Sequence, residues 1–354
     1  MSKITHVYWF APYNLTCPST RYRGKMPLEY AQEKHNITFD FVTPSRSLKG
    51  LYAFAKIYFK ILFFRKKNAL IVIQKICSNR LYANALKLLV LLKNKQTLYD
   101  LDDAEYLRQD TKSLHFFLQH CEKIQVGSLA LKNYCLQFNP NVYIATSPVY
   151  RHTSKKVSKN KKIHIGWVGD VGDGNNISQN FSHKTSLFHI LFPQILQIKH
   201  PLKLSIIGVK KASDVPQIVR FFEQSKNIEL DIPLNLNWED DAWLYPKICQ
   251  FDIGLSPLVK HPFNIAKSAF KAKQYLSCGV LTIASNVGEN SRYVKHGYNG
   301  FIADQPSDFV DFIHQVATMS QAEYRVYLEN AFNSYENFSM HNYCLLLLQK
   351  KRDT

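Results

Sequence analysis

Residues 251–300, FDIGLSPLVKHPFNIAKSAFKAKQYLSCGVLTIASNVGENSRYVKHGYNG, are the most informative stretch of this chain. Their pattern predicts a strand, a basic loop, a short helix, a glycine turn, a second strand and a glycine-rich loop that opens another helix. Such a unit places lysines and a helix N-terminus beside the carboxyl edge of a sheet, where α/β proteins bind phosphorylated ligands. The stretch therefore predicts an α/β fold with a phosphate site in the second half of the chain.

The rest of the chain repeats this alternation. Runs of β-branched and aromatic residues are separated by stretches with helical periodicity, as in parallel sheets covered by helices. The predicted strands are 4–10, 37–42, 69–75, 96–101, 123–128 and 142–146 in the first half, and 163–169, 202–209, 228–232, 251–257, 280–285 and 300–303 in the second. A length of 354 residues favours two domains, and the lysine-rich segment 152–162 is the expected linker.

Composition indicates a folded, cytoplasmic protein. Hydrophobic residues make up 46% of the chain, enough for two cores. The seven cysteines are scattered and form no C-x-x-C pair, so we expect neither a disulfide framework nor a zinc site, and a reducing compartment. No uncharged apolar run reaches the ~18 residues that span a bilayer, and the N-terminus is predicted to be a strand, not a signal peptide.

Positive charge is concentrated in the first half of the chain. Residues 1–160 contain 25 Lys and Arg against 9 Asp and Glu, a net charge of +16, whereas the remainder contributes +2 of the total of +18. This asymmetry predicts that the first half faces an anionic partner. Nucleic acid and the anionic inner leaflet of a membrane are the two candidates.

The segment 46–67, RSLKGLYAFAKIYFKILFFRKK, is amphipathic at helical period. Its mixture of lysines and large aromatic residues is typical of a helix that lies in a membrane interface. A helix that packs on the core with a wet basic face is the alternative. No helix-turn-helix, RNA-recognition or zinc pattern accompanies these residues, which disfavours nucleic acid.

The predicted helix 267–277 would place Lys267 and Lys271 on one face, with Ser268 near its start. An anion there would meet two ammonium groups and the positive end of the helix. Lys273 would point elsewhere, into solvent. A second loop, GWVGDVGDGNN (166–176), contains Gly169, Gly172 and Gly174, which would allow the backbone to approach a ligand, although its spacing matches neither a P-loop nor a dinucleotide fingerprint.

Polar residues also follow three strands of the first half. They are Arg21 and Arg23, then Gln74 and Lys75, then Asp100, Asp102, Asp103 and Glu105. Parallel strands would bring these groups to one carboxyl edge. The carboxylates could bind a metal ion, but such groups more often cap a helix or pair with an arginine.

The segment from FDIGLSPL through PFN, KSAFKAKQYLSCGVLTIAS, VGEN and HGYNGF resembles the signature of retaining GT-B glycosyltransferases of the "glycosyl transferases group 1" family. GWVG, NWEDD and STRYR with YDLDD also fit, so that the likeness covers nearly the whole chain. It implies two Rossmann-like domains facing each other across a cleft, with a C-terminal helix that returns to the first domain. The implied domains are an acceptor-binding domain at 1–155, with a helix at about 338–354, and a nucleotide-sugar-binding domain at 160–337.

The resemblance also implies roles for individual residues. Lys271 stands at the place of a donor-phosphate lysine, and Gly169 lies in the loop along which the donor passes. The implied donor-binding set is Gly169, Ser268, Gln274, Gly288, Glu289 and Asn290. The two glutamates of the family's E-x7-E motif are replaced by Ala266 and Gln274, and Leu281 replaces the usual proline, which leaves a non-catalytic relative as an alternative.

The expected activity is transfer of a hexose from a nucleoside-diphosphate sugar to an anionic lipid-linked or lipooligosaccharide acceptor, at the cytoplasmic face of the inner membrane. We expect retention of configuration without a metal or another cofactor, and no nucleic-acid partner. The expected catalytic residues are Lys271, Lys267 and Asp103, and the expected acceptor-binding residues are Arg21, Arg23, Lys75 and Asp102. A nucleotide-sugar epimerase of the same fold and a basic nucleic-acid binder are the alternatives.

Overall fold

The computed structural model describes residues 4–45, 47–76, 80–107, 111–152, 156, 158–171, 181–210, 212–237 and 240–349. Gly172 and Gly174 of the predicted glycine loop therefore lie outside the described residues, as does part of the predicted linker. The chain divides into two compact units. Unit 1 contains Met1–Pro148, Ala266–Ser268 and Phe338–Thr354, and unit 2 contains Val149–Ile265 and Ala269–Asn337.

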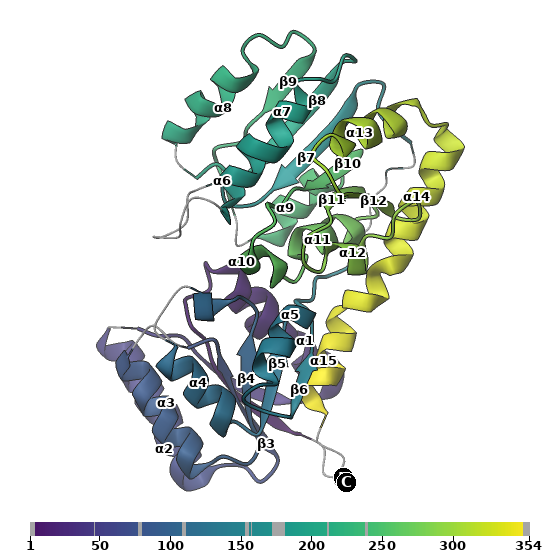
Figure 1. Ribbon diagram of the computed structural model, residues 1–354. Helices are drawn as coiled ribbons and strands as arrows, with labels where there is room; N and C mark the ends of the chain where they lie inside the picture. The colour runs from purple at the N-terminus through teal and green to yellow at the C-terminus, as the bar shows by residue number, and fades with distance from the viewer. Residues whose placement is uncertain are drawn as a thin grey trace. The chain divides into compact units, whose positions relative to one another are not determined.

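Unit 1 is built on a six-stranded parallel sheet with the order β2-β1-β3-β4-β5-β6, of which β3, β4, β5 and β6 are labelled in Figure 1. The strands are β1 (His6–Phe10), β2 (Thr38–Val42), β3 (Ala69–Gln74), β4 (Thr97–Leu101), β5 (Lys123–Val126) and β6 (Val142–Ile144). Every residue of β1, β3 and β4 is buried, which explains the continuous apolar runs of β1 and β3, since a central parallel strand is covered on both faces. The six strands predicted for the first half are confirmed.

Helices cover this sheet and include the last helix of the chain. They are α1 (Met26–His35), α2 (Leu48–Phe64), α3 (Arg80–Leu92), α4 (Lys112–His120), α5 (Leu129–Cys135) and α15 (Met340–Leu348), with short helical turns η1 (Thr20–Lys25) and η2 (Glu105–Leu107). Helix α3 contacts α2 and α4, while α15 contacts α1. The predicted return of the last helix to the first domain is thus confirmed.

Unit 2 is built on a second six-stranded parallel sheet, with the order β12-β11-β10-β7-β8-β9. Its strands, all predicted, are β7 (Ile163–Val168), β8 (Leu202–Ile207), β9 (Ile228–Asp231), β10 (Ile253–Ser256), β11 (Leu281–Ser285) and β12 (Gly300–Ala303). The order of strands reverses where β7 lies beside β10. Open α/β sheets bind ligands at the carboxyl ends of the strands at such a switch point.

The helices of unit 2 connect these strands, and one of them begins later than predicted. They are α6 (His183–Thr185), η4 (Ser186–Leu191), α7 (Phe192–Ile195), η5 (Ala212–Asp214), α8 (Val215–Phe222), α9 (Asp241–Ile248), α10 (Pro262–Ile265), α11 (Phe270–Ser277), α12 (Asn290–Tyr293), α13 (Asp308–Thr318), α14 (Gln321–Asn333) and η6 (Ser334–Phe338). The prediction of a helix from residue 267 is wrong at its start. Ala269 has a left-handed φ of 55°, so the α-helix begins only at Phe270.

Each unit has a π-helical turn after its first strand. In unit 1 it is η1, in which Thr20 to Gly24 are all buried, and in unit 2 it is η4. Turns of this type are rare and are frequently found at functional sites. Both mark the first connection of a Rossmann-like sheet as a place where the backbone departs from regular geometry.

A buried ion pair holds the carboxyl edge of the first sheet together. The guanidinium of Arg23 binds both carboxylate oxygens of Asp100 and also donates to Ala145 O (2.9 Å) and Ser147 Oγ (3.2 Å). Neither side chain is exposed. Burial opposes ionisation of Arg23, but the neighbouring Asp100 more than offsets this and raises the pKa of Arg23. Tyr343 of α15 donates to Arg23 O (2.8 Å), so the last helix joins the same cluster.

We predict that Arg23→Met lowers the free energy of unfolding by about 3–5 kcal/mol, because it leaves the carboxylate of Asp100 buried without its cation. The double variant Arg23→Met/Asp100→Leu removes both charges and should lose clearly less than the sum of the two single variants. Urea unfolding of the four proteins measures the coupling. Additive losses would contradict a structural ion pair.

His164 on β7 predicts a pH dependence of stability. Its pKa is lowered to about 4 by burial first, and then by Lys203 and Lys156. Its Nε2 lies 2.7 Å from Ser205 Oγ, which donates to Asp231 Oδ2 (2.6 Å), so a neutral ring with a proton on Nε2 fits this chain. A lowered histidine pKa means that the folded state resists protonation. The stabilising contribution is present above the ordinary pKa of 6.5 and is lost as the pH falls toward 4.

We therefore expect His164→Gln to flatten the loss of unfolding free energy between pH 6.5 and 4 by about 3 kcal/mol relative to the unsubstituted chain. Urea titrations at a series of pH values measure both profiles, and the difference between them removes the contribution of the carboxyl groups. Parallel profiles would show that His164 does not resist protonation in the folded protein.

Candidate functional site

Lys271 occupies the first turn of α11, beside the switch point of the second sheet. Its Nζ lies 5.5 Å from the centre of the Trp167 ring, and Trp167 is the fifth residue of β7. Gly169 follows this strand, and a Cβ atom there would come within 2.6 Å of Lys271 Cε and 2.8 Å of the Trp167 ring. The absence of a side chain at Gly169 is what allows the lysine to lie across the end of β7. The resemblance implied a donor role for each of these residues separately, and the structure brings the two residues together.

His183 orients the ammonium group of Lys271. The Nζ atom lies 2.8 Å from His183 Nε2, while His183 Nδ1 lies 3.3 Å from Asp170 O. A neutral imidazole with its proton on Nδ1 would donate to Asp170 and accept from Lys271. Its ring also meets Trp167 edge-on at 5.9 Å. His183 was not among the predicted site residues, because a single histidine at the start of a helix carries no motif.

Gln274 lies one turn further along α11 and is buried. Its amide donates to Tyr245 Oη at 3.4 Å, and the Tyr245 ring stacks on His152 with the ring centres 3.5 Å apart. Burial lowers the pKa of His152 to about 4. Gln274 is thus held by an aromatic pair from α9 and from the segment that follows Val149.

The loop after β11 supplies the remaining predicted donor residues. Gly288 has a φ of 62°, a conformation that favours glycine, and it turns the chain into α12. Glu289 is buried and accepts from Arg292 Nη1 at 3.1 Å. Asn290 is fully buried and donates to Ser285 O (3.0 Å), and its Oδ1 has no hydrogen-bond partner among the described residues. A buried acceptor of this kind suits a ligand hydroxyl group.

The prediction that Lys273 points into solvent is wrong. The side chain is fully buried, with Nζ 5.1 Å from the centre of the Tyr293 ring. Helix α11 contacts β10, β11, α12 and α14, and all its residues from Ala272 onward are buried. A helix that is surrounded by other elements has no solvent-exposed face along that part of its length, so Lys273 lies in the protein interior.

Lys267 and Ser268 do not lie on α11, which corrects the prediction that Lys267 and Lys271 share a helical face. Both belong to unit 1, where Ser268 O accepts from Thr146 at 3.5 Å and Ser268 Oγ lies 3.4 Å from Ser147 Oγ. The neighbouring Ala266 O accepts from Ser128 Oγ at 2.7 Å. Ser268 therefore cannot cap the first turn of α11.

Lys75 forms the centre of the candidate site in unit 1. It follows β3 in a left-handed conformation (φ 31°), and its Nζ lies 3.0 Å from Asp102 Oδ1, 2.7 Å from Asp103 Oδ2 and 3.9 Å from Glu105 Oε1. Positive φ in a non-glycine residue is strained, and such strain gathers at binding sites. The structure thus brings together Lys75, Asp102 and Asp103, as predicted from their places after β3 and β4.

The charged groups of this cluster shift one another's pKa values. Burial opposes the charge on Lys75, but Asp102, Asp103 and Glu105 raise its pKa well above the ordinary value. Burial also raises the pKa of Asp102, which Lys75 partly offsets. Asp103 is the most exposed of the three acids, at 28% against 10% for Asp102 and 3% for Glu105. Of these carboxylates, Asp103 is therefore the one best placed to meet a ligand.

The two arginines predicted to bind an acceptor have structural partners. Arg21 donates through Nη1 to Leu15 O (2.8 Å) and Thr16 O (3.1 Å), which ties down the loop after β1. Arg23 is buried with Asp100, so the prediction that it binds an acceptor does not fit its position. Pairing with Arg23 also accounts for Asp100, as the alternative interpretation of the acidic cluster expected.

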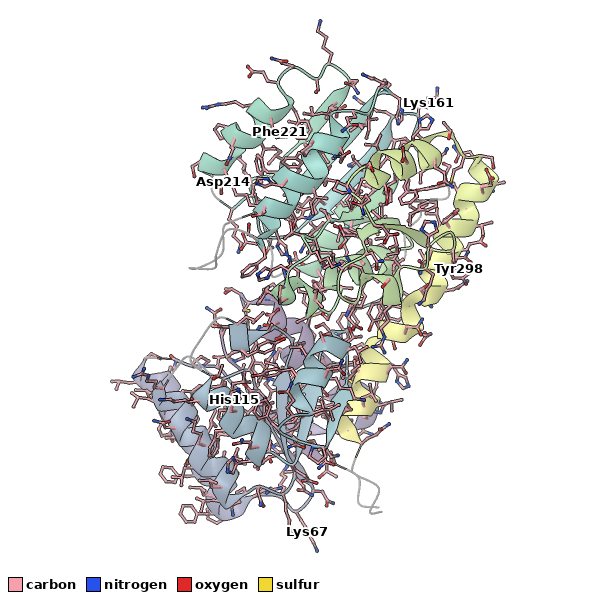
Figure 2. The ribbon with its side chains drawn as sticks, in the orientation of Figure 1. Lys67, His115, Lys161, Asp214, Phe221 and Tyr298 are labelled. Atoms are coloured by element: carbon pink, nitrogen blue, oxygen red, sulfur yellow. The ribbon has the colours of Figure 1, made fainter. Side chains whose placement is uncertain are left out.

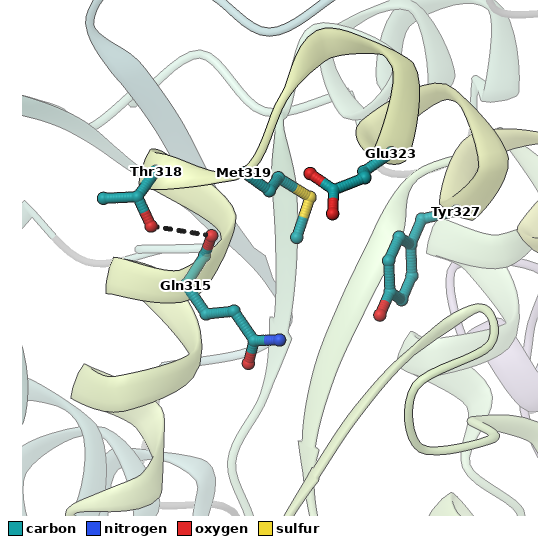
Figure 3. Close-up of a pocket in the computed structure, with 5 residues that line it drawn as sticks. All are labelled: Gln315, Thr318, Met319, Glu323 and Tyr327. Atoms are coloured by element: carbon teal, nitrogen blue, oxygen red, sulfur yellow. Dashed lines mark hydrogen bonds between the residues drawn. The ribbon is translucent and has the colours of Figure 1, made fainter.

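A separate hollow of about 260 Å³ lies between α13 and α14. It is lined by Gln315, Thr318, Met319, Glu323 and Tyr327 (Figure 3). Two of these side chains already serve the helix ends: Thr318 donates to Gln315 O (3.2 Å), and Glu323 accepts from the backbone of Ser320 (2.8 Å). None of the predicted site residues lines this hollow, so we do not assign the candidate chemistry to it.

Comparison with solved structures identifies the fold. HepE from Anabaena in complex with UDP matches with a TM-score of 0.62 and 12% identity, over 97% of this chain and 98% of that one, and HepE is also known with UDP-glucose. A glycosyltransferase from Rickettsia africae matches with a TM-score of 0.68 and 11% identity, over 97% and 96% of the two chains. The lipopolysaccharide outer core galactosyltransferase WaaB matches with a TM-score of 0.62 and 11% identity, over 97% and 99%.

A scan against protein-family models and a search of curated proteins gave no match. At 11–12% identity, the structural likeness is evidence of a shared architecture. Two parallel six-stranded sheets and near-complete coverage agree with it. The chain has the GT-B fold of these glycosyltransferases, as its sequence predicted.

Proposed function

We propose that this protein is a glycosyltransferase that transfers a hexose from a nucleoside-diphosphate sugar to a lipid-linked or lipooligosaccharide acceptor in cell-envelope glycan synthesis. The observation that carries the proposal is the placement of Lys271, in the first turn of α11 and against Gly169 and His183, at the switch point of the second sheet. Neighbours of the same fold that hold UDP and UDP-glucose support the donor class. WaaB supports the acceptor class.

The proposed role of Lys271 is electrostatic. As the bond to the sugar breaks, negative charge grows on the leaving diphosphate. The ammonium group and the first N–H groups of α11 stabilise this charge without reorganising. In the retaining reaction that we propose, the acceptor attacks from the face that the diphosphate leaves, and the departing phosphate takes the acceptor proton. This scheme needs no metal ion.

Gln274 and the β11 loop are proposed to hold the rest of the donor. The neutral amide of Gln274 suits the ribose hydroxyls, and Asn290 Oδ1 suits a hydroxyl of the sugar. In unit 1, we propose that Lys75, Asp102 and Asp103 orient the acceptor, with Asp103 nearest to it. Lys267, which α11 does not include, is left without a catalytic role in this scheme.

The proposed place of action is the cytoplasmic face of the membrane that supplies the acceptor. No helix among the described residues is long and apolar enough to cross a bilayer. The basic first half of the chain suits an anionic acceptor and an anionic surface.

We predict that Lys271→Ala lowers turnover at least ~10²-fold, because it removes one preorganised charge-stabilising group. Release of nucleoside diphosphate from a panel of UDP- and GDP-hexoses, with a lipid-linked acceptor, measures this. Lys295→Ala, which removes an exposed lysine of the same unit, is the matched control and should stay within a few-fold of the unsubstituted enzyme. Activity of Lys271→Ala at the control level would remove Lys271 from the mechanism.

The same assay separates the alternative activity. An epimerase would isomerise the nucleotide sugar without releasing nucleoside diphosphate. Melting temperatures in the presence of UDP and GDP test donor binding by itself, since a ligand that binds only the folded state raises stability. A chain that no nucleotide stabilises would contradict the proposal.

Gly169→Ala is expected to weaken the nucleotide-induced rise in melting temperature while the protein stays folded. The new Cβ would lie 2.6 Å from Lys271 Cε and 2.8 Å from the buried Trp167 ring, so the lysine must leave its place on the ring. Titration with UDP measures the affinity of both proteins. Unchanged affinity would show that the position of Lys271 does not affect nucleotide binding.

A further inference from the structure

Helices α2 and α3 expose an unusual amount of apolar surface. Six large side chains of α2 and four of α3 are more than half exposed: Leu48, Leu51, Tyr52, Phe59, Phe63, Phe64, Leu81, Leu88, Leu91 and Leu92. Single exposed apolar residues are ordinary, but a group on two neighbouring helices marks an interaction surface. The sequence indicated α2 alone as an interfacial candidate, and the structure adds α3 to it.

The exposed side chains are not left over from poor packing, because the opposite faces of both helices are occupied. Tyr58 of α2 donates to Ala85 O of α3 at 2.9 Å, and the Phe54 ring meets Tyr82 edge-on at 5.2 Å. On the outer side, Phe59 and Phe63 stack with ring centres 6.3 Å apart. In Figure 2, side chains project outward from this pair of helices, and Lys67 points away from the ribbon.

Positive charge surrounds the same surface. Residues 41–99, which contain both helices, include twelve Lys and Arg and no Asp or Glu. Among the residues of this segment that the structure describes, the exposed cations are Lys49, Lys56, Lys66, Lys67, Arg80 and Lys95. The apolar face and its basic surround together match an interface helix, which buries large apolar groups below the lipid headgroups and pairs its lysines with anionic lipids.

The chemistry of the surface favours a lipid bilayer over the other occupants. A second copy of this chain would bring two faces together that both lack acids and are both basic, which is repulsive. A nucleic acid would use the cations and the aromatic rings, but it offers no apolar environment for the exposed Leu48, Leu81 and Leu88.

We propose that the outer faces of α2 and α3 form one docking surface that inserts into the headgroup region of an anionic bilayer. The surface brings unit 1 to the membrane that carries the acceptor. The purpose of this docking rests on the proposed function, but docking itself requires neither the donor nor sugar transfer.

Sedimentation with lipid vesicles tests the proposal on the full chain without nucleotide. We expect binding to phosphatidylcholine vesicles that contain phosphatidylglycerol, and weak binding to phosphatidylcholine alone. Raising the salt from about 0.1 M to about 1 M should weaken binding, because the screening length falls from about 10 Å to about 3 Å. Equal binding to both vesicle types, or none to either, would overturn the proposal.

Substitutions locate the surface. Leu48→Ser/Tyr52→Ser/Phe63→Ser/Leu81→Ser should reduce vesicle partitioning at least ~10-fold, since four large apolar groups no longer enter the bilayer. The matched control is Leu196→Ser/Val219→Ser/Leu234→Ser/Val326→Ser, which removes four exposed apolar groups from unit 2 and should bind as the unsubstituted chain does. Equal partitioning of the two variants into vesicles would overturn the assignment of the docking surface to α2 and α3.

Two further measurements separate the outcomes. Light scattering without vesicles tests self-association, and a dimer that the α2–α3 variant abolishes would assign the surface to a second copy instead. The melting-temperature rise with UDP should be the same in this variant, because the donor site lies in unit 2. Vesicle binding without sugar transfer would support the docking surface and contradict the proposed reaction. Transfer to a detergent-dispersed acceptor without vesicle binding would support the reaction and contradict the docking surface.

Discussion

The buried ion pair between Arg23 and Asp100 is the constraint on which unit 1 depends. It joins the π-helical turn after β1 to the carboxyl end of β4, and hydrogen bonds extend it to β5 through Gln125 and to α15 through Tyr343. Breaking a buried pair of this kind is costly, because one charge is then left in the interior. Its position fixes the edge of the sheet at which the candidate acceptor residues lie.

The dependence of Lys75 on this pair follows from the backbone. Lys75 N donates to Asp100 O at 2.8 Å, so the residue whose side chain binds Arg23 also holds the strained turn at Lys75. Two residues later, Asp102 meets the ammonium group of Lys75. At the end of β4, the fully buried pair of Arg23 and Asp100 therefore supports the partly exposed cluster of Lys75, Asp102 and Asp103. Rigid support of this kind is what a binding site requires.

Sequence alone predicted the strands and their order of occurrence, because buried parallel strands leave continuous β-branched and aromatic runs. It also placed Lys75, Asp102 and Asp103 together, since residues after neighbouring parallel strands must meet. It could not place the start of α11, because Ala269 adopts a left-handed conformation that alanine rarely takes, and no residue type signals it. Nor could it find His183 or the burial of Lys273, both of which depend on contacts between segments far apart in the chain.

Gln274 stands where the family that the sequence resembles has a glutamate, and the geometry of α11 gives this difference a physical meaning. Lys271 and residue 274 are three positions apart on one helix, where a glutamate could pair with the lysine. The neutral amide instead donates to Tyr245, and Lys271 lies against His183 and Trp167. A carboxylate at residue 274 would also repel a diphosphate near the helix N-terminus. A neutral residue at position 274 therefore favours an anionic ligand at Lys271, and in the proposed donor site the hydroxyls near Gln274 would be recognised by an uncharged group.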